Sequence, residues 1–326
     1  MYKFVNVFTE YKSPEVSNNY VLETFAKCDE KNIAFVIVDN SLDENNYNKL
    51  SNYYGSNWKE DSIEGRTVRR IKTRFDSDET EIIYVKNTVN SGYGSGGNLG
   101  MKIAIQVFEP EYLIISNNDM VCLEQALKIS EIKNIFVNNP TVGIVGVNIV
   151  GLDGGNNSPC RKVSLIDRWI LPEVFFPISR KFKSHSADDL IDDAPDGIVY
   201  RVRGSFMTLR SEVFTKSGGF DEKIFLYGEE PILAERSAKV GYQVYHYGAI
   251  HMLHNHYMDN KTLTRNELAK IKQRFDSEMY YYSEYCSAPM WQIKIAQLLF
   301  PQYHWRYKMF NSLKTLLKRS NRKKEI

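Results

Sequence analysis

Two adjacent acidic residues, Glu229 and Glu230, open an amphipathic helical pattern, and several histidines follow the next apolar run. Removing two neighbouring carboxylates from water is unfavourable unless a cation or a reacting proton stabilises them. The helix dipole alone also favours acids in a first turn, so a structural role stays open. The pattern between residues 204 and 254 nevertheless predicts acid–base or metal-ion chemistry.

Two further acids stand where apolar runs end. Asp39 closes the run IAFVIVD, and Asp119 closes YLIISNND. In open α/β sheets ligands bind at the carboxyl ends of the strands, so both acids are predicted to face one functional edge. A carboxylate in such a place can instead cap the following helix.

Short apolar runs alternate with helical periodicity through the first half of the chain. The runs cover residues 4–8, 33–39, 81–87, 112–119 and 142–147, and helical patterns lie between the first four. This alternation predicts an α/β fold with a mostly parallel sheet flanked by helices. Residues 55–78 form a polar insertion without an assigned role, and the irregular segment 153–199 is predicted to be a lid or substrate platform.

The glycine-rich segment NSGYGSGGNLG permits two interpretations. Gly92, Gly94 and Gly97 satisfy the spacing G-x-G-x-x-G between a strand and a helix, which is typical of NAD-dependent oxidoreductases. The segment follows a later strand instead of the first one, and no separate acid ends the next strand in a ribose-binding position. The alternative is a turn whose glycines let the backbone approach a ligand closely.

Positive charge is concentrated at the C-terminal end of the chain. The 326 residues carry a formal net charge of +2, but residues 305–326 hold eight Lys or Arg and one Glu, which makes +7 there and −5 elsewhere. Periodicity beyond residue 258 predicts three helices, the second of them ending at Pro301. The last helix is basic and amphipathic, which suits either docking on an anionic membrane or core packing with a solvated cationic face. No recognition motif accompanies the charge, so no nucleic-acid partner is predicted.

The cysteines and the N-terminal residues bear on cellular location. Four cysteines lack CxxC or metal-ligand spacing, and the opening MYKFVNVFTEYKS lacks the apolar run of a signal peptide. Both features favour the reducing cytoplasm. The sequence also lacks an apolar stretch of about 18 residues, the length typical of a membrane span. The expected location is therefore cytoplasmic.

Four sequence blocks occur in an order typical of one enzyme family. They are VIVDNSLDE, NSGYGSGGNLG, YLIISNNDM and GSFMTLRSEVFTKSGGFDEKIFLYGEEPILAERSAKVGYQV, followed by a histidine. Over about residues 3–256 the chain resembles the family-2 glycosyltransferases of GT-A fold, and among them the rhamnosyltransferase-like subgroup of polysaccharide assembly. The resemblance implies a catalytic domain over residues 1–257 and leaves a helical region with a basic amphipathic tail over residues 258–326.

The resemblance implies roles on the side of the sugar donor. It implies nucleotide contacts from Thr9, Tyr11, Asp39, Asn90, Gly94, Asn98 and Asn118. A carboxylate at position 39 suits the imide N–H of uracil or thymine, because that group is a donor. Asn replaces the first acid of the usual metal motif at 117–119, which leaves Asp119 as the anionic ligand for Mg²⁺ or Mn²⁺. His251 best matches the histidine of the metal site, and His254 is the substitute.

The resemblance also implies the acid–base chemistry and the reaction. Glu229-Glu230 matches a Glu-Asp pair whose second acid is the general base, so Glu230 is the expected base, Glu229 the fallback, and Arg236 the residue that orients them. The implied reaction is inverting transfer from a UDP- or dTDP-sugar to a saccharide or lipid-linked saccharide in cell-surface polysaccharide assembly. The protein is then expected to be peripheral on the inner membrane face, and its C-terminal helices would suit a homodimer. An inactive GT-A-like binding protein stays open beside the oxidoreductase.

Overall fold

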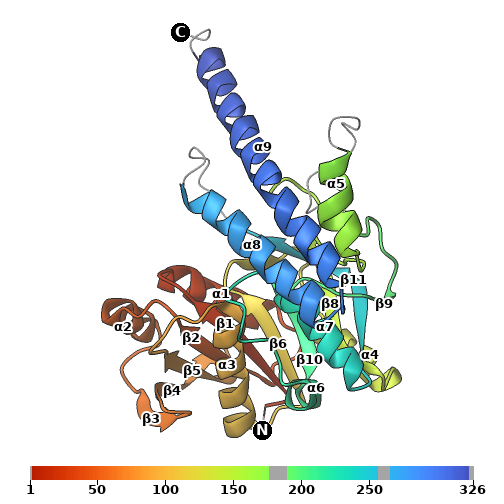
Figure 1. Cartoon of the computed structure of the whole chain (residues 1–326). Helices are drawn as coiled ribbons and strands as arrows, with labels where there is room; N and C mark the ends of the chain where they lie inside the picture. Colours follow the sequence, from red (N-terminus) through yellow and green to blue (C-terminus); the bar gives the residue numbers. More distant parts are fainter. Residues whose placement is uncertain (1, 176–188, 256–264, 323–326) are drawn as a thin grey trace. The chain divides into compact units, whose positions relative to one another are not determined.

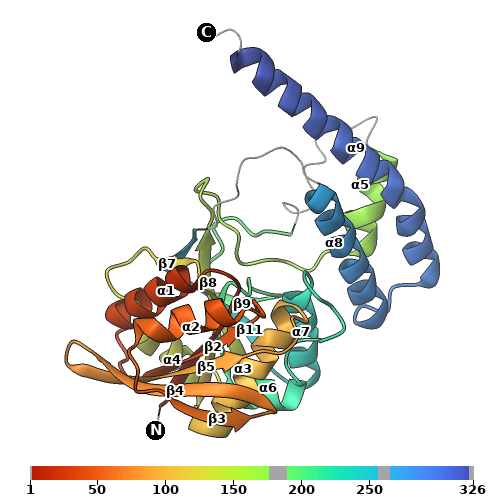
Figure 2. The same cartoon turned by 90° about the vertical axis from the view of Figure 1, so that its left-hand side faces the viewer.

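The computed structural model describes residues 2–175, 189–255 and 265–322, and the chain falls into two compact units (Figures 1 and 2). Unit 1 comprises residues 1–161, 190–225 and 229–256, and unit 2 comprises residues 162–189, 226–228 and 257–326. Three separate segments of chain therefore build each unit. The predicted domain boundary between residues 257 and 258 lies outside the described residues.

Four parallel strands form the centre of the sheet in unit 1. They are β1 (Phe4–Glu10), β2 (Ile33–Asp39), β5 (Asp78–Lys86) and β6 (Tyr112–Asn117), in the order β5-β2-β1-β6. These strands coincide with the first four apolar runs of the sequence. They are apolar almost throughout because helices bury both faces of the sheet. The predicted α/β fold with a mostly parallel sheet is thus confirmed.

The sheet continues as a mixed sheet on the side of β6. β10 (Phe206–Arg210) lies antiparallel between β6 and β8 (Val142–Val150), and β11 (Gln243–His254) runs parallel to β8. β7 (Met120–Cys122) and β9 (Gly197–Val199) both pair antiparallel with β11. This arrangement brings the segment that follows β6 beside the end of β11.

The polar insertion at residues 55–78 extends the other edge of the sheet. It forms a hairpin of β3 (Lys59–Ile63) and β4 (Arg66–Phe75), and β4 pairs antiparallel with β5. Val68 and Ile71 of β4 are buried, whereas four of the five residues of β3 are exposed. Charged side chains on an edge strand disfavour pairing with another chain, which accounts for the polar composition of this segment.

Six helices of unit 1 cover the two faces of the sheet. They are α1 (Pro14–Lys27), α2 (Glu44–Tyr53), α3 (Tyr93–Phe108), α4 (Ile129–Asn138), α6 (Ser211–Ser217) and α7 (Glu229–Lys239). Side chains of α1, α2 and α4 share a core with Phe4 and Phe8, while those of α3, α6 and α7 share a second core with Val5 and Val7. Alternate residues of β1 therefore serve opposite faces, as the two-residue period of a strand requires.

Unit 2 contains the π-helical turn η1 (Ile166–Ile170) with α5 (Leu171–Val174), and the long helices α8 (Arg265–Glu284) and α9 (Met290–Arg322). Its interior holds charged groups: Arg168 donates to Glu278 at 2.8 Å, and the Trp169 indole donates to the same carboxylate at 2.6 Å. Burial opposes ionisation of Glu278, but Arg168 and Arg274 lower its pKa to about 2. The buried arginine is thus paired with a fully ionised acid.

The prediction that a helix ends at Pro301 is wrong, because α9 continues through that residue (Figure 1). Proline removes one backbone donor and normally breaks or kinks a helix. Here Pro301 and Gln297, whose carbonyl loses that donor, are both exposed, so water can satisfy the carbonyl group. None of the described helices is both long and apolar enough to cross a bilayer.

Candidate active site

The candidate site forms where the parallel strands of unit 1 end. Glu10 ends β1, Asp39 ends β2 and Asn117 ends β6, and strand register places Thr9 between Val38 and Asn117. The carboxyl ends of these strands meet at one edge because the strands run parallel. β1 therefore lies between the strand that ends in Asp39 and the strand that precedes Asp119.

Asp39 forms a buried carboxylate pair with Glu10, which the sequence analysis did not single out. Its Oδ1 accepts from the Ser41 amide at 2.8 Å and its Oδ2 from the Tyr84 hydroxyl at 2.8 Å. Glu10, opposite it in register, is fully buried and accepts from Asn46 and from the Ser13 amide. Glu10 lies two residues beyond the apolar run 4–8, and the structure extends β1 to Glu10, so this acid also ends a strand.

Burial and proximity shift the ionisation of this pair. The pKa of Glu10 is raised to about 7, chiefly by burial and also by the charge of Asp39, although the hydrogen bonds from Ser13 and Asn46 lower it. Two adjacent buried carboxyl groups cannot both ionise at low cost. The edge of the sheet where β1 and β2 end therefore holds one carboxyl group, that of Glu10, with a pKa close to neutral pH.

The glycine-rich segment brings α3 against the strand ends. A Cβ at Gly96 would lie 2.7 Å from both Thr9 and Asn40, and one at Gly100 would lie 2.4 Å from Val7. At Gly92, which has a φ of 99°, a Cβ would lie 1.9 Å from the Phe225 carbonyl oxygen. Close packing of the backbone therefore accounts for the glycines at positions 92, 96 and 100.

Two residues predicted to bind nucleotide lie in the same segment. The Asn90 side chain accepts from the Gly92 amide at 3.1 Å and so shapes the turn before α3. A Cβ at Gly94 would lie 3.5 Å from the Glu229 side chain, so this glycine stands directly beside the acidic pair. The start of α3 thus faces the start of α7.

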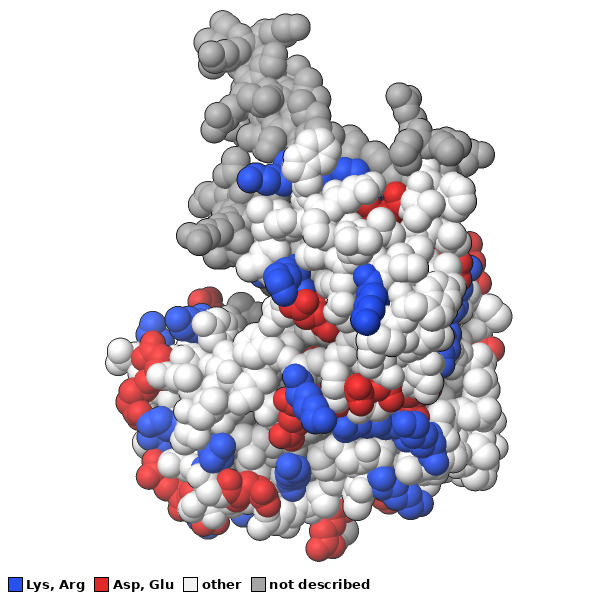
Figure 3. All heavy atoms as spheres, viewed as in Figure 1, with Lys and Arg blue, Asp and Glu red and all other residues white. Residues whose placement is uncertain are grey.

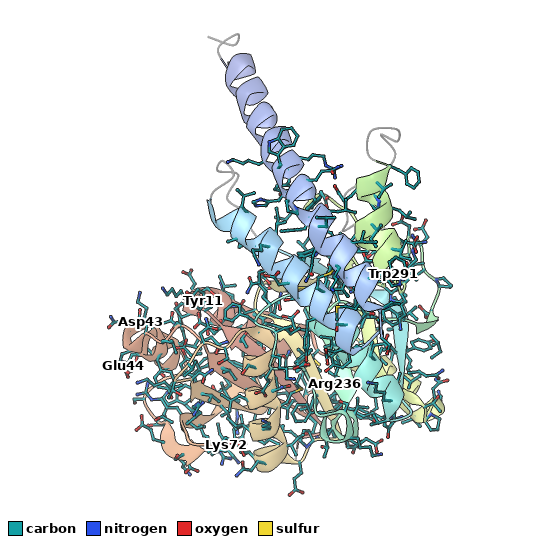
Figure 4. The ribbon with its side chains drawn as sticks, in the orientation of Figure 1. Tyr11, Asp43, Glu44, Lys72, Arg236 and Trp291 are labelled. Atoms are coloured by element: carbon teal, nitrogen blue, oxygen red, sulfur yellow. The ribbon has the colours of Figure 1, made fainter. Side chains whose placement is uncertain are left out.

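Asn98 and Arg236 both hold the loop that leads from α6 to α7. Asn98 accepts from the Phe220 amide at 2.9 Å and donates to the Phe220 carbonyl at 3.0 Å. Arg236 donates to the Gly219 and Phe220 carbonyls at 3.1 Å and forms an ion pair with Asp221 at 3.3 Å (Figure 4). These contacts fix residues 219–221, so the two side chains position the acidic pair through the loop that precedes it.

Asn118 and Tyr11 lie near the beginning of α1. The Asn118 amide donates to the Ser17 hydroxyl at 2.8 Å and to the Ser13 hydroxyl at 3.1 Å, which ties the turn after β6 to α1. Tyr11 follows β1 and is 56% exposed (Figure 4). An exposed aromatic ring beside a strand end is available for stacking on a base.

The structure brings His254, and not His251, to Asp119. His254 Nε2 lies 3.2 Å from Asp119 Oδ1 and 3.3 Å from the amide nitrogen of Asn117. His251 Nδ1 lies 2.8 Å from Glu124 Oε1, and its Nε2 lies 3.1 Å from Asn148. The two histidines are three residues apart on β11, and residues separated by an odd number point to opposite faces of a strand.

Asp119 and His254 offer one oxygen and one nitrogen ligand for a divalent cation. Within the described ranges no group of three or more His, Cys, Asp or Glu side chains converges as a complete metal cage. Mg²⁺ and similar ions keep several waters and are often held by one or two protein groups together with substrate phosphates. The pair therefore fits an ion that binds with a diphosphate-bearing ligand.

Glu230 is held in an ionised state at the start of α7. Its Oε1 accepts from the Gly204 amide at 3.1 Å. Burial opposes its ionisation, but the Arg201 and Arg203 guanidinium groups and the Gly204 hydrogen bond keep its pKa below the usual range. Glu229 is buried beside it. Of the acidic pair, Glu229 is thus buried and Glu230 is partly buried, beside two arginines that sequence reasoning did not assign.

Tyr93 connects the acidic pair with the strand-end acid. Its hydroxyl donates to the Gly204 carbonyl at 2.8 Å. Burial raises its pKa well above the usual range, and the charges of Glu230, Glu229 and Asp119 raise it further. The Tyr93 phenol therefore experiences the electrostatic field of Glu230 and Glu229 and, more weakly, that of Asp119.

Comparisons with known proteins identify the fold. No protein-family model and no curated protein matches the sequence. Among solved structures, GalNAc-T7 with UDP, GalNAc and Mn²⁺ matches with a TM-score of 0.53 and 11% identity over 87% of this chain and 49% of that chain. The likeness, together with the sheet described above, shows a GT-A fold.

Two further solved structures are similar at lower TM-scores. The mannosyltransferase PcManGT from Pyrobaculum calidifontis, in complex with GDP-Man and Mn²⁺, has a TM-score of 0.48 and 11% identity over 96% of this chain and 80% of that one. TarS of S. aureus has a TM-score of 0.44 and 14% identity over 86% of this chain and 44% of that one. The chain spans about half the length of the GalNAc-T7 and TarS chains.

Proposed function

We propose that this protein transfers a sugar from a nucleotide-diphosphate donor to a saccharide hydroxyl, with inversion at the anomeric carbon. The observations that support this most directly are the 3.2 Å approach of His254 to Asp119 and the action of the Glu230, Glu229 and Asp119 charges on the buried Tyr93 phenol. A cation ligand pair and an ionised base at one edge are what such a transfer needs. GalNAc-T7, which has the same fold, was crystallised with UDP, GalNAc and Mn²⁺.

Glu230 is the proposed general base. Its lowered pKa keeps the carboxylate ionised at neutral pH, ready to take the proton of the acceptor hydroxyl. As that proton leaves, the acceptor oxygen attacks the anomeric carbon, and the bond from that carbon to the diphosphate oxygen breaks. Glu229 is the alternative general base. The charges of Arg201 and Arg203 stabilise the ionised form of Glu230.

Asp119 and His254 are the proposed ligands of Mg²⁺ or Mn²⁺, in place of the sequence-based choice of His251. When bound, such an ion would offset the negative charge that builds on the departing diphosphate. Asn117 contacts His254 at 3.3 Å and so helps to fix the ring. Glu124 holds His251 at 2.8 Å in a separate polar group, which leaves that histidine outside the proposed ligand set.

The remaining assignments concern the donor, the acceptor and the location. Asp39, Thr9 and Tyr11 are proposed to contact the nucleotide base, with Asn90, Gly94, Asn98 and Asn118 shaping that side of the site. The donor is a UDP- or dTDP-sugar, and the acceptor is a saccharide or lipid-linked saccharide of cell-surface polysaccharide assembly, as in the rhamnosyltransferase-like subgroup. We propose that the protein works on the cytoplasmic side of the membrane, peripherally, and as a homodimer.

A nucleotide-release screen over UDP- and dTDP-sugars with Mg²⁺ or Mn²⁺ tests the proposed function. Glu230→Gln should lower turnover by about a hundredfold or more while leaving donor binding nearly intact, because it removes only the proton acceptor. Glu235→Gln, on the same helix, is the matched control and should retain activity. Near-normal turnover of Glu230→Gln would remove this residue from the role. An NADH arm in a thermal-shift assay tests the oxidoreductase alternative.

A further inference from the structure

One side of α9 exposes large apolar side chains at a regular spacing. Trp291, Leu298 and Trp305 are 56%, 78% and 63% exposed, and we refer to these three residues as the α9 stripe (Figure 4 labels Trp291). They are seven residues apart, which is two helical turns, so their side chains lie on the same side of the helix. Met290, beside the first of them, is 60% exposed.

The opposite side of α9 already supplies the packing that unit 2 needs. Ile293 and Ala296 are buried, and Phe300 stacks on Phe275 with ring centroids 4.1 Å apart. Tyr303 meets Trp169 edge to face at 5.5 Å. Core packing thus accounts for one apolar face of this helix and leaves the α9 stripe without a role in the described part of unit 2.

The charged residues of α9 itself all have one sign. From residue 290 to residue 324 the sequence contains nine Lys or Arg and no Asp or Glu. Lys294 and Lys308 are exposed on α9, whereas Arg306 is buried against Glu173. On the face of unit 1 seen in Figure 3, by contrast, acidic and basic side chains are interspersed. An apolar row on an exclusively basic helix is typical of segments that lie in the interface of an anionic bilayer.

We propose that the α9 stripe and its basic neighbours dock this protein on an anionic phospholipid bilayer. The indole rings of Trp291 and Trp305 would enter the headgroup region, where tryptophan is favoured, and the lysines would contact lipid phosphates. As the occupant of the α9 stripe, a second copy of the chain fits less well, because antiparallel or parallel pairing of two such helices would bring like charges together, so the proposed homodimer would pair through another surface. The inference deepens the proposed function, since it names the surface that would reach a lipid-linked acceptor.

Vesicle co-sedimentation in the absence of donor tests the docking surface. The full chain should bind vesicles of phosphatidylcholine mixed with phosphatidylglycerol, should not bind phosphatidylcholine alone, and should dissociate as salt rises. The combined variant Trp291→Ser, Leu298→Ser, Trp305→Ser should partition about tenfold or more weakly, because it loses the buried apolar area. The matched control Leu22→Ser, Val137→Ser, Leu152→Ser removes exposed apolar residues of unit 1 and should bind like the unaltered protein.

Tryptophan fluorescence of the unaltered protein gives a second measurement, and it does not depend on whether the serine variant folds. Brominated lipids quench only indoles that contact the bilayer. Trp291 and Trp305 should be quenched, while Trp169, which is buried in unit 2, should not. The Trp291→Phe, Trp305→Phe variant should accordingly lose the quenching and keep its binding, because phenylalanine also enters the interface.

Three outcomes would overturn the proposal. They are no binding to anionic vesicles, equal binding by the stripe variant, and a concentration-dependent dimer that the stripe variant loses while vesicle binding persists. The last outcome would assign the stripe to a second copy of the chain. Nucleotide release with a water-soluble acceptor is measured on the same variants and should be unchanged. Failure of docking is thereby distinguished from failure of the proposed transfer activity.

Discussion

The histidine that stands beside Asp119 is determined by the alternation of side chains along β11. His254 pairs in register with Met120, next to Asp119, while His251 faces Asn148 and Glu124. Both histidines follow the same apolar run, and the sequence-based choice was His251, with His254 as the substitute. Because side chains alternate between the two faces of a strand, a shift of β11 by one residue would exchange the faces of the two histidines, so the strand register decides which of them reaches Asp119.

We expect His254→Ala to weaken Mn²⁺-dependent binding of UDP or dTDP by about tenfold or more, because it removes a ligand of the proposed ion. His251→Ala is the matched control and should bind nucleotide nearly as well as the unaltered protein. Calorimetry with and without Mn²⁺ measures both. The reverse order of effects would return His251 to the metal site.

The Glu10–Asp39 pair makes stability depend on pH. The pKa of Glu10 is raised from 4.5 to about 7, so between these values the folded state binds more protons than the unfolded state. The free energy of unfolding should therefore fall by about 2–3 kcal/mol as pH rises from about 5 to 8. Glu10→Gln mimics the protonated acid and should remove most of this slope.

Urea denaturation at several pH values measures the slope for both proteins. The difference between them is the informative quantity, because burial lowers the pKa of His246 and so gives the opposite slope below about pH 6.5. Glu15→Gln, an exposed acid on α1, is the control and should leave the slope unchanged. Identical slopes for the unaltered protein and Glu10→Gln would contradict the assignment.

At the scale of elements, α3 approaches the sheet through its glycines. Gly100 stands over Val7 and Val38, where an added Cβ would lie 2.4 Å and 3.0 Å from their methyl groups. Val7 and Val38 belong to the central strands that end at the site. How closely α3 packs on the sheet therefore sets the distance between the glycine-rich turn and the ends of β1 and β2.

Gly100→Ala should destabilise the protein by about 1–3 kcal/mol, because overpacking outweighs the better helix propensity of alanine. The control Gln106→Ala, on the exposed side of the same helix, should change stability by less than about 0.5 kcal/mol. Chemical denaturation measures both. A stabilised Gly100→Ala variant would show that the helix can shift away from β1 and β2 without cost.

At the scale of the whole molecule, unit 2 is assembled from segments that are distant in the chain. Arg168 precedes β9 and β10 in sequence, yet its ion-pair partner Glu278 lies on α8. The Ser277 hydroxyl likewise donates to the Leu226 carbonyl at 2.9 Å. Unit 2 therefore includes part of the segment 153–199 that was predicted to be a lid or platform.

Glu278→Gln should destabilise the protein by about 3–5 kcal/mol, because Arg168 would be left as an uncompensated buried charge. Glu284→Gln, near the end of the same helix and exposed, is the matched control and should be close to neutral. Thermal unfolding measures both variants. An unchanged midpoint for Glu278→Gln would mean that Asp189, 3.8 Å from Arg168, compensates fully.

The central strands and the acids Asp39 and Asp119 could be predicted from the sequence, because periodicity and apolar runs are local properties of the chain. The sequence also determined that Glu229 and Glu230 open a helix. Local patterns say nothing about partners that are distant in sequence. Only the tertiary structure decided that Asn98 and Arg236 hold the 219–221 loop and that His254 meets Asp119. The continuation of α9 through Pro301 was likewise seen only in the structure. Sheet order, strand register and solvent exposure arise when distant segments pack together, so local patterns do not predict them.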